Sequence, residues 1–179
     1  MNNSIEVHGY HGTSQTKATS ILKNGFLASD NDYDWLGTGI YFFQDAPMRA
    51  KQWAIEQHPN EPAVICARIQ LDNCIDLFDV KWFPILKNIY NLFSDRYRSA
   101  NRPLPKQNPL RSKAHRLDCA FFNFASQLIS DDEQTVECIR SVFVEGESIF
   151  PDSAIFDLAH AQIAVKNPAL ITEYYLIEI

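Results

Sequence analysis

The sequence predicts an α+β fold with a split β-sheet core, flanking helices and a basic insertion. Short strand-like apolar runs alternate with helical periodicities over residues 5–80, and strand patterns dominate the second half of the chain. Residues 81–116 interrupt this rhythm with prolines and basic residues. The chain has 179 residues and is 46% apolar, which is enough for one buried core, so we expect a single domain over residues 1–179.

The first elements are a strand, a helix and a second strand. Residues 5–13, IEVHGYHGT, place apolar side chains at nearly alternate positions and predict a strand. Residues 15–25, QTKATSILKNG, predict a helix that Ser14 and Thr16 can cap, with Gly25 in a left-handed conformation at its end. Residues 37–43, GTGIYFF, then predict a strand that is entered through glycines.

A second helix and two further strands complete the first half. Residues 45–58, DAPMRAKQWAIEQH, predict a helix with Asp45 as its cap and Pro47 in its first turn. Residues 63–71, AVICARIQL, alternate as a strand does, and residues 74–79, CIDLFD, continue as an extended piece.

Residues 81–116 are predicted to form an insertion on the core. An amphipathic helical pattern over residues 83–98 is followed by an irregular, proline-bearing run over residues 99–113. The insertion holds nine Lys and Arg residues and one acid, Asp95, so it carries +8 in a chain whose net charge is −6.

The second half reads as one helix followed by strands. Residues 117–129 predict a helix, and residues 136–146, 160–166 and 171–179 predict strands with alternating apolar positions.

Cysteine spacing and hydropathy exclude several classes of protein. Cys66, Cys74, Cys119 and Cys138 are widely separated and form no C-x-x-C pair, so we interpret them as reduced structural thiols and expect no metal site. No stretch of about 18 uncharged apolar residues and no signal-peptide pattern occurs, which favours a soluble cytoplasmic protein with no membrane contact.

Two short motifs carry the functional prediction. Each is weak alone, because a histidine at a strand end is often structural and Gly-x-Gly before a strand is often a turn. In the order HGTS, SILKNGF and LGTGIYFF, from His11 to Phe43, the sequence resembles the ADP-ribosyltransferases of the poly(ADP-ribose) polymerase and diphtheria-toxin class. That class carries His-Gly-Ser/Thr on its first core strand and Gly-x-Gly-Ile-Tyr-Phe on the next.

The resemblance implies a catalytic set of His11, Tyr41 and Gln162. The class usually has Glu at the head of a late strand, and residues 160–177, HAQIAVKNPALITEYYLI, place Gln162 there. A carboxylate stabilises an oxocarbenium-like transition state electrostatically, whereas an amide only hydrogen-bonds. The resemblance therefore implies single transfer of ADP-ribose rather than chain elongation. Arg49 is a second departure, since the polymerases have Ser at that position.

NAD is the implied co-substrate. His11 would bind the adenosine ribose, the Gly12 backbone would pair with the nicotinamide carboxamide, and Gly39 would permit close approach. Tyr41 would stack on the nicotinamide ring, and Trp53 is a candidate for its other face or, equally, a core residue. The implied NAD-binding residues are His11, Gly12, Thr13, Gly39, Tyr41 and Trp53.

The acceptor of the transfer is inferred from charge. The basic insertion attracts polyanions, and its aromatic residues can stack on unpaired bases. Arg96, Arg98 and Arg102 are therefore predicted to bind a nucleic acid acceptor, RNA or DNA, with Glu145 near the site to orient it. A protein acceptor, a merely solvated basic face, and docking of an acidic inhibitory protein remain alternatives.

The resulting hypothesis is an intracellular bacterial toxin or anti-phage effector that modifies nucleic acid and is restrained by an antitoxin. Three alternatives stay open: a catalytically silent NAD or ADP-ribose binding module, an RNA 2′-phosphotransferase, and an arginine-modifying toxin whose Glu-x-Glu pair would be Glu145 and Glu147.

Overall fold

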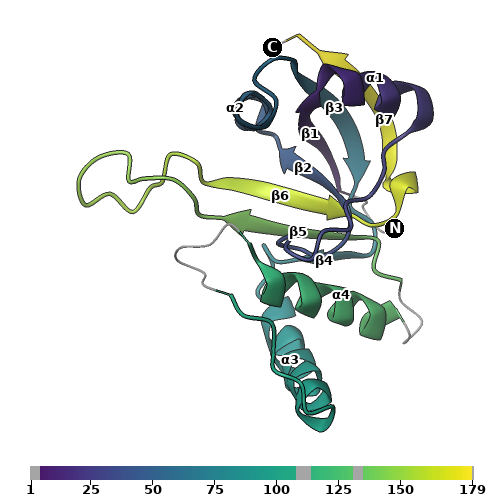
Figure 1. Cartoon of the computed structure of the whole chain (residues 1–179), viewed down its shortest axis with the longest axis vertical. Coiled ribbons are helices and arrows are strands. Elements are labelled where there is room, and N and C mark those ends of the chain that lie inside the picture. Colours follow the sequence, from purple (N-terminus) through teal and green to yellow (C-terminus); the bar gives the residue numbers. More distant parts are fainter. Residues whose placement is uncertain (1–4, 108–113, 131–134, 179) are drawn as a thin grey trace.

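A computed structural model describes residues 5–107, 114–130 and 135–178. It contains one seven-stranded sheet with the strand order β4-β5-β6-β2-β1-β3-β7 (Figure 1). The strands are β1 (Glu6–Ser14), β2 (Ile40–Gln44), β3 (Pro62–Gln70), β4 (Cys74–Asp76), β5 (Cys138–Phe143), β6 (His160–Val165) and β7 (Ile171–Ile177). Only β4 and β5 pair in parallel. The predicted α+β class is confirmed.

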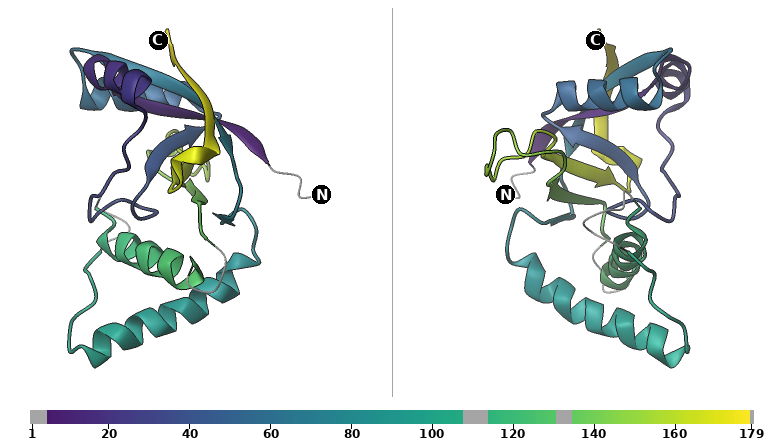
Figure 2. Two further views of the ribbon diagram at one scale, coloured as in Figure 1. Left: turned by 90° about the vertical axis from the view of Figure 1, so that its right-hand side faces the viewer. Right: turned by 60° about the vertical axis from the view of Figure 1, so that its left-hand side comes forward.

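The helices gather at two ends of the molecule. They are α1 (Gln15–Asn24), α2 (Pro47–Gln57), α3 (Trp82–Ser99) and α4 (Arg116–Ser130), with a short 3-10 turn, η1 (Pro168–Leu170). Figures 1 and 2 show α1 and α2 beside β1, β3 and β7, whereas α4 lies next to β4 and β5 and α3 lies beyond it. The sheet therefore connects two helical layers.

β1 pairs with β3 along its whole length but with β2 over only a short stretch. Between β1 and β3 nine residue pairs face each other, from Glu6–Gln70 to Ser14–Pro62. Between β1 and β2 only Gly9–Gln44 and Tyr10–Phe43 do so. β1 and β2 consequently diverge after Tyr10, although both belong to the same seven-stranded sheet.

Helix caps follow the sequence prediction in α1 but not in α2. Ser14 Oγ accepts a hydrogen bond from the Lys17 amide, and Gly25 has a φ of +85°. Asp45 does not cap α2, because α2 begins after Ala46 without a side-chain cap. Asp45 instead adopts a φ of +50° and donates its N–H to the carbonyl of His8, so it closes a turn onto β1.

Apolar side chains cover both faces of the sheet. On one face Val7, Phe42 and Ile69 are buried with Ile163. On the other, residues from β4, β5 and β6 pack against α3 and α4, and Ala50 and Ala54 of α2 pack on the upper part of the sheet.

The amphipathic pattern predicted for residues 83–98 is α3, which buries Leu86, Ile89 and Phe93. Arg111 and Lys113 lie outside the described residues.

The cysteines form no disulfide in the described part of the chain. The four cysteines are free thiols, and Cys66, Cys119 and Cys138 are buried. Across the described ranges, none of the helices has the length and apolar character that crossing a bilayer requires.

Candidate active site at the fork between β1 and β2

The fork begins where β2 leaves β1. In a strand, the N–H and C=O of one residue point to the same edge, and this edge alternates along the chain. The His8 carbonyl accepts from the Asp45 amide at 2.9 Å, so the backbone groups of His8 face β2. Because the edge alternates, the N–H and C=O groups of Tyr10 and Gly12, two and four residues later, also point to the β2 side. Because pairing with β2 ends at Tyr10–Phe43, the Gly12 peptide groups point into the opening of the fork.

His11 bridges this fork with its side chain. Its Nδ1 lies 2.8 Å from the Tyr41 carbonyl oxygen, which can only accept, so Nδ1 carries the hydrogen. The imidazole also packs edge-on against Phe26, with ring centroids 5.5 Å apart. Burial lowers the pKa of His11, so the ring is neutral near pH 7 and its Nε2 carries a lone pair.

Strand alternation separates the predicted catalytic residues into two groups. Phe43 faces Gln162 across β2 and β6, and Tyr10 faces Phe43 across β1 and β2. Side chains two residues apart share a face, so Gly12, Tyr41 and Gln162 lie on one face of the sheet. His11 and Thr13 belong to the other face, and His11 reaches the first group only through the Tyr41 carbonyl.

Gly12 is the point where α2 contacts β1. A Cβ at Gly12 would lie 2.4 Å from the backbone oxygen of Ala50 and 3.1 Å from Cδ1 of Trp53. Trp53 is 37% exposed, so it lies beside Gly12 at the surface instead of filling the core. The close approach allowed by glycine here brings the first turn of α2 to the fork.

Arg49, in this first turn, is the least expected feature of the site. Its guanidinium stands 5.1 Å from the centroid of the Phe43 ring, and its Nη2 pairs with Glu145 Oε2 at 3.2 Å. The side chain is only 11% exposed. Among the described residues, its buried Nε and Nη1 have no hydrogen-bond partner. A buried guanidinium with two unused donors is suited to an oxygen-bearing ligand.

His160 and Gln162 extend this site along β6. His160 Nε2 lies 2.8 Å from Gln162 Nε2, and His160 Nδ1 lies 2.6 Å from the Leu158 carbonyl oxygen. Glu145 Oε2 is 3.9 Å from His160 Nδ1. Burial lowers the pKa of His160 more than the nearby Glu145 carboxylate raises it. The four side chains of Arg49, Glu145, His160 and Gln162 thus form one polar cluster, which we call the β6 cluster.

Tyr41 lies at the base of the fork with its hydroxyl occupied. The hydroxyl donates to the Gly37 carbonyl at 2.6 Å and accepts from the Leu36 amide at 2.9 Å. Burial raises the pKa of the phenol, so it stays protonated. Tyr41 therefore anchors the loop that precedes its own strand.

Two side chains from other elements hold the same loop. Asn123 Oδ1 on α4 accepts from the Thr38 amide at 2.8 Å, and Lys166 Nζ donates to the Thr38 carbonyl at 2.8 Å. Burial lowers the pKa of Lys166 to about 8. The loop over residues 36–39 is thus fixed from α4 and from the end of β6.

The remaining predicted residues have varied positions. Gly39 approaches β6, since a Cβ there would lie 3.1 Å from the Val165 oxygen. Thr13 is buried. Glu145 joins the β6 cluster, whereas Arg96, Arg98 and Arg102 lie on α3 and the segment after it, where they line two adjoining pockets. The predicted acceptor-binding residues therefore form two separate groups.

Sequence reasoning assigned no role to Arg49 and left His160 without one. Alternation along the strand predicts only that His160 shares a side with Gln162. The pairing of β5 with β6, in which Phe143 lies opposite His160, is what brings Glu145 beside it. No model of a protein family matches the sequence, and no curated protein matches it either.

Proposed function

We propose that this protein is an NAD-dependent mono-ADP-ribosyltransferase with a nucleic acid acceptor. The observation that carries the proposal is the buried Arg49, which precedes Ala50, the residue of α2 that approaches Gly12. Its guanidinium lies over Phe43, on the face that also holds Gln162, and two of its donor nitrogens are unused among the described residues. The resemblance of residues 11–43 to the poly(ADP-ribose) polymerase and diphtheria-toxin class supplies the reaction type.

The fork fits a carboxamide. The nicotinamide amide presents a carbonyl acceptor and an NH2 donor, which complement the Arg49 donors and the Gly12 peptide group that points into the fork. Trp53, partly exposed beside Gly12, offers an aromatic surface for the ring. Arg49, a charged hydrogen-bond donor, thus stands at the position where the polymerases have a serine.

NAD supplies a good leaving group, because neutral nicotinamide departs from a pyridinium cation. In the transfer, the bond between ribose C1′ and the nicotinamide nitrogen breaks, and its electron pair stays on that nitrogen. A lone pair of the acceptor forms the new bond to C1′. Gln162 binds a ribose hydroxyl, and Glu145, whose side chain is 28% exposed, takes the acceptor's proton.

The biological role follows from the same resemblance. Small members of this class act as intracellular toxins or phage-defence effectors, and we propose such a role in the cytoplasm. Toxins of this kind need an inhibitor, so a protein antitoxin is the proposed partner.

The test measures release of nicotinamide and transfer of label from NAD carrying radiolabel in its adenylate part. Purified protein is incubated with single-stranded RNA, single-stranded DNA or lysate protein. Arg49→Met should reduce the rate at least about tenfold, since hydrogen bonds to charged groups are worth about 1.5–3 kcal/mol. Gln162→Ala removes a neutral hydrogen bond worth about 0.5–1.5 kcal/mol and should reduce the rate about two- to tenfold.

Arg68→Met is the matched control. Arg68 is 46% exposed and pairs with Glu6, at the start of β1, and with Glu173 on β7. Both partners are exposed, so the loss of Arg68 should leave the rate unchanged. Binding of NAD without nicotinamide release would establish a silent binding module instead, and absence of NAD binding would overturn the proposal.

A further inference from the structure

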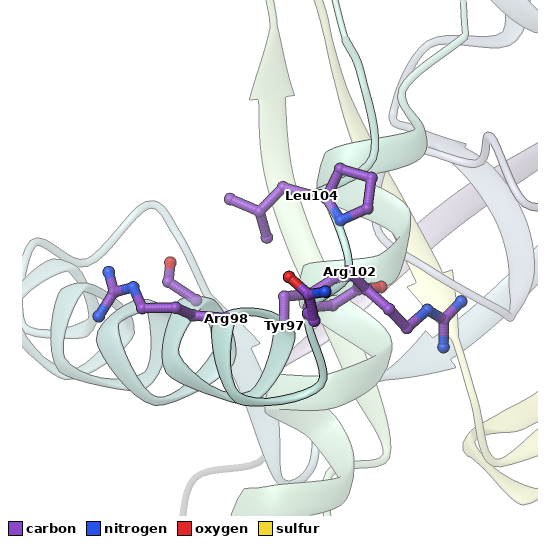
Figure 3. Close-up of a pocket in the computed structure, with 7 residues that line it drawn as sticks. Tyr97, Arg98, Arg102 and Leu104 are labelled. Atoms are coloured by element: carbon purple, nitrogen blue, oxygen red, sulfur yellow. The ribbon is translucent and has the colours of Figure 1, made fainter.

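Two adjoining pockets lie at the C-terminal end of α3. Figure 3 shows the first, which is lined by α3 and the segment after it. The second lies between α3 and α4. Their volumes are about 540 and 320 Å³, and they share Tyr97 and Arg102. Arg98 lines the first and Arg96 the second, and among the described residues neither lining includes an acidic side chain. In a chain of net charge −6, these concave sites present only positive charge.

The arginines lie against aromatic rings. The Arg96 guanidinium carbon is 5.7 Å from the centroid of the Phe124 ring, and that of Arg102 is 5.9 Å from the centroid of Tyr97. Tyr97 in turn packs against Phe93 at 4.9 Å. A guanidinium held beside a ring offers a charged donor and a stacking surface at one place.

Two of the three arginines keep their charge uncompensated. Arg98 pairs with Asp95 at 2.7 Å. Arg96 and Arg102 have no carboxylate within 4.0 Å in the described part of the chain. Their charge is therefore available to an anionic ligand.

The second pocket is connected to the fork. Asn123 lines this pocket, and its Oδ1 also accepts the Thr38 amide. The hydroxyl of Tyr41 donates to Gly37 in the same loop. A ligand in the pocket thus lies against the helix that fixes the loop before Tyr41.

We propose that Arg96, Tyr97 and Arg102 bind a single-stranded nucleic acid and that this strand carries the group that accepts ADP-ribose. The inference rests on the proposed function. Phosphates match the two uncompensated arginines, and an unpaired base matches the Tyr97 ring, whereas a duplex keeps its bases stacked internally. An acidic protein would match the charge but would not need the aromatic surfaces.

The experiment measures binding without NAD, so it is independent of transfer. Fluorescence anisotropy follows a labelled single-stranded RNA of about 12 nucleotides, within the size range of single-strand sites, and a single-stranded DNA of the same sequence. RNA and DNA both carry phosphates and bases, so comparing the two oligonucleotides shows which of these nucleic acids the pockets prefer. Arg96→Gln/Arg102→Gln should raise Kd at least about tenfold and reduce the slope of log K against log salt by about 1.4, or 0.7 for each lost phosphate contact.

Two further variants separate specific contacts from bulk charge. Lys17→Gln/Lys23→Gln removes the same charge from the exposed side of α1 and should change Kd less than twofold. Tyr97→Leu keeps an apolar side chain but removes the ring, and it should weaken the single strand several-fold while leaving a duplex of equal length unaffected.

Equal loss in both double variants, or equal affinity for polyglutamate, would overturn the inference. If label is transferred from NAD to lysate protein and the oligonucleotides do not bind, this inference fails and the transferase activity stands with another acceptor. If the strands bind in the predicted manner and no label is transferred, the single-strand binding surface stands, whereas the transferase proposal and the acceptor role of the strand both fail.

Discussion

His160 determines which end of the Gln162 amide faces its ligand. The Leu158 carbonyl, 2.6 Å from His160 Nδ1, can only accept, so Nδ1 carries the hydrogen. In the neutral ring Nε2 must then accept, and Gln162 turns its NH2 group to the ring at 2.8 Å. Its carbonyl oxygen is thereby directed away from His160 and is available to a hydroxyl donor. Protonation of the ring would reverse this orientation.

Gln162→Glu should raise the pKa of His160. A carboxylate at this position favours the imidazolium form, whereas in the present chain burial lowers the pKa. NMR titration of the histidine Cε1–H signals measures this value. The signal of His8, which is exposed and lies outside this cluster, serves as the internal reference. An unchanged pKa of His160 would show that the two side chains do not interact in solution.

The folded state should lose stability as the pH falls below about 6.5, the ordinary pKa of histidine. Burial lowers the pKa of His11, His115 and His160, so the unfolded chain takes up protons at a pH where the folded chain does not. The contribution of these histidines to the free energy of unfolding is therefore fully present above pH 6.5. It decreases as the pH falls towards their lowered pKa values in the folded protein. Urea unfolding at pH 7.5 and pH 5.5 measures the difference.

His115→Phe should reduce this acid sensitivity. The His115 ring lies 3.5 Å from the Trp35 ring, centroid to centroid, and its nitrogens have no hydrogen-bond partner among the described residues. Phe conserves the stacked shape and cannot titrate. His8→Gln, at an exposed site, should leave the pH dependence unchanged, and an equal effect of both variants would contradict the assignment.

Gly12→Ala should destabilise the protein and impair NAD binding together. The added Cβ would lie 2.4 Å from the Ala50 oxygen, which belongs to the backbone of α2 and cannot rotate away. Overpacking of this kind costs about 1–3 kcal/mol, and a chain of this size then loses about 2–12 °C in Tm. Gly39→Ala meets its nearest atom at 3.1 Å and should cost less. Differential scanning calorimetry compares the two, and equal Tm values would contradict the close contact between β1 and α2.

Tyr41→Phe should lower stability while it keeps the aromatic ring that the resemblance assigns to stacking. The change leaves the Leu36 amide and the Gly37 carbonyl without their partner, which costs about 1–3 kcal/mol. Urea unfolding measures this loss, and Tyr33→Phe, at a 44% exposed site, is the control. A variant as stable as the parent protein would show that the loop does not depend on this hydroxyl.

Much of the fold was predictable because its signals are local. Alternation identified β1 and β3, and Ser14 and Gly25 marked the ends of α1, since strand and cap preferences act over a few residues. Asp45 was assigned wrongly as a cap, because its N–H bonds to His8, which is 37 positions away in the chain. A long-range turn had overridden a local preference.

The sequence by itself determined the order of the elements, the α+β class and the motif around His11 and Tyr41. Only the tertiary structure decided that His11 lies on the opposite face from Tyr41 and Gln162, and that Arg49 is buried against Phe43 beside Glu145. These relationships depend on which strands pair, and where pairing stops. Pairing register and burial arise from contacts between distant segments, so no short pattern in the chain encodes them.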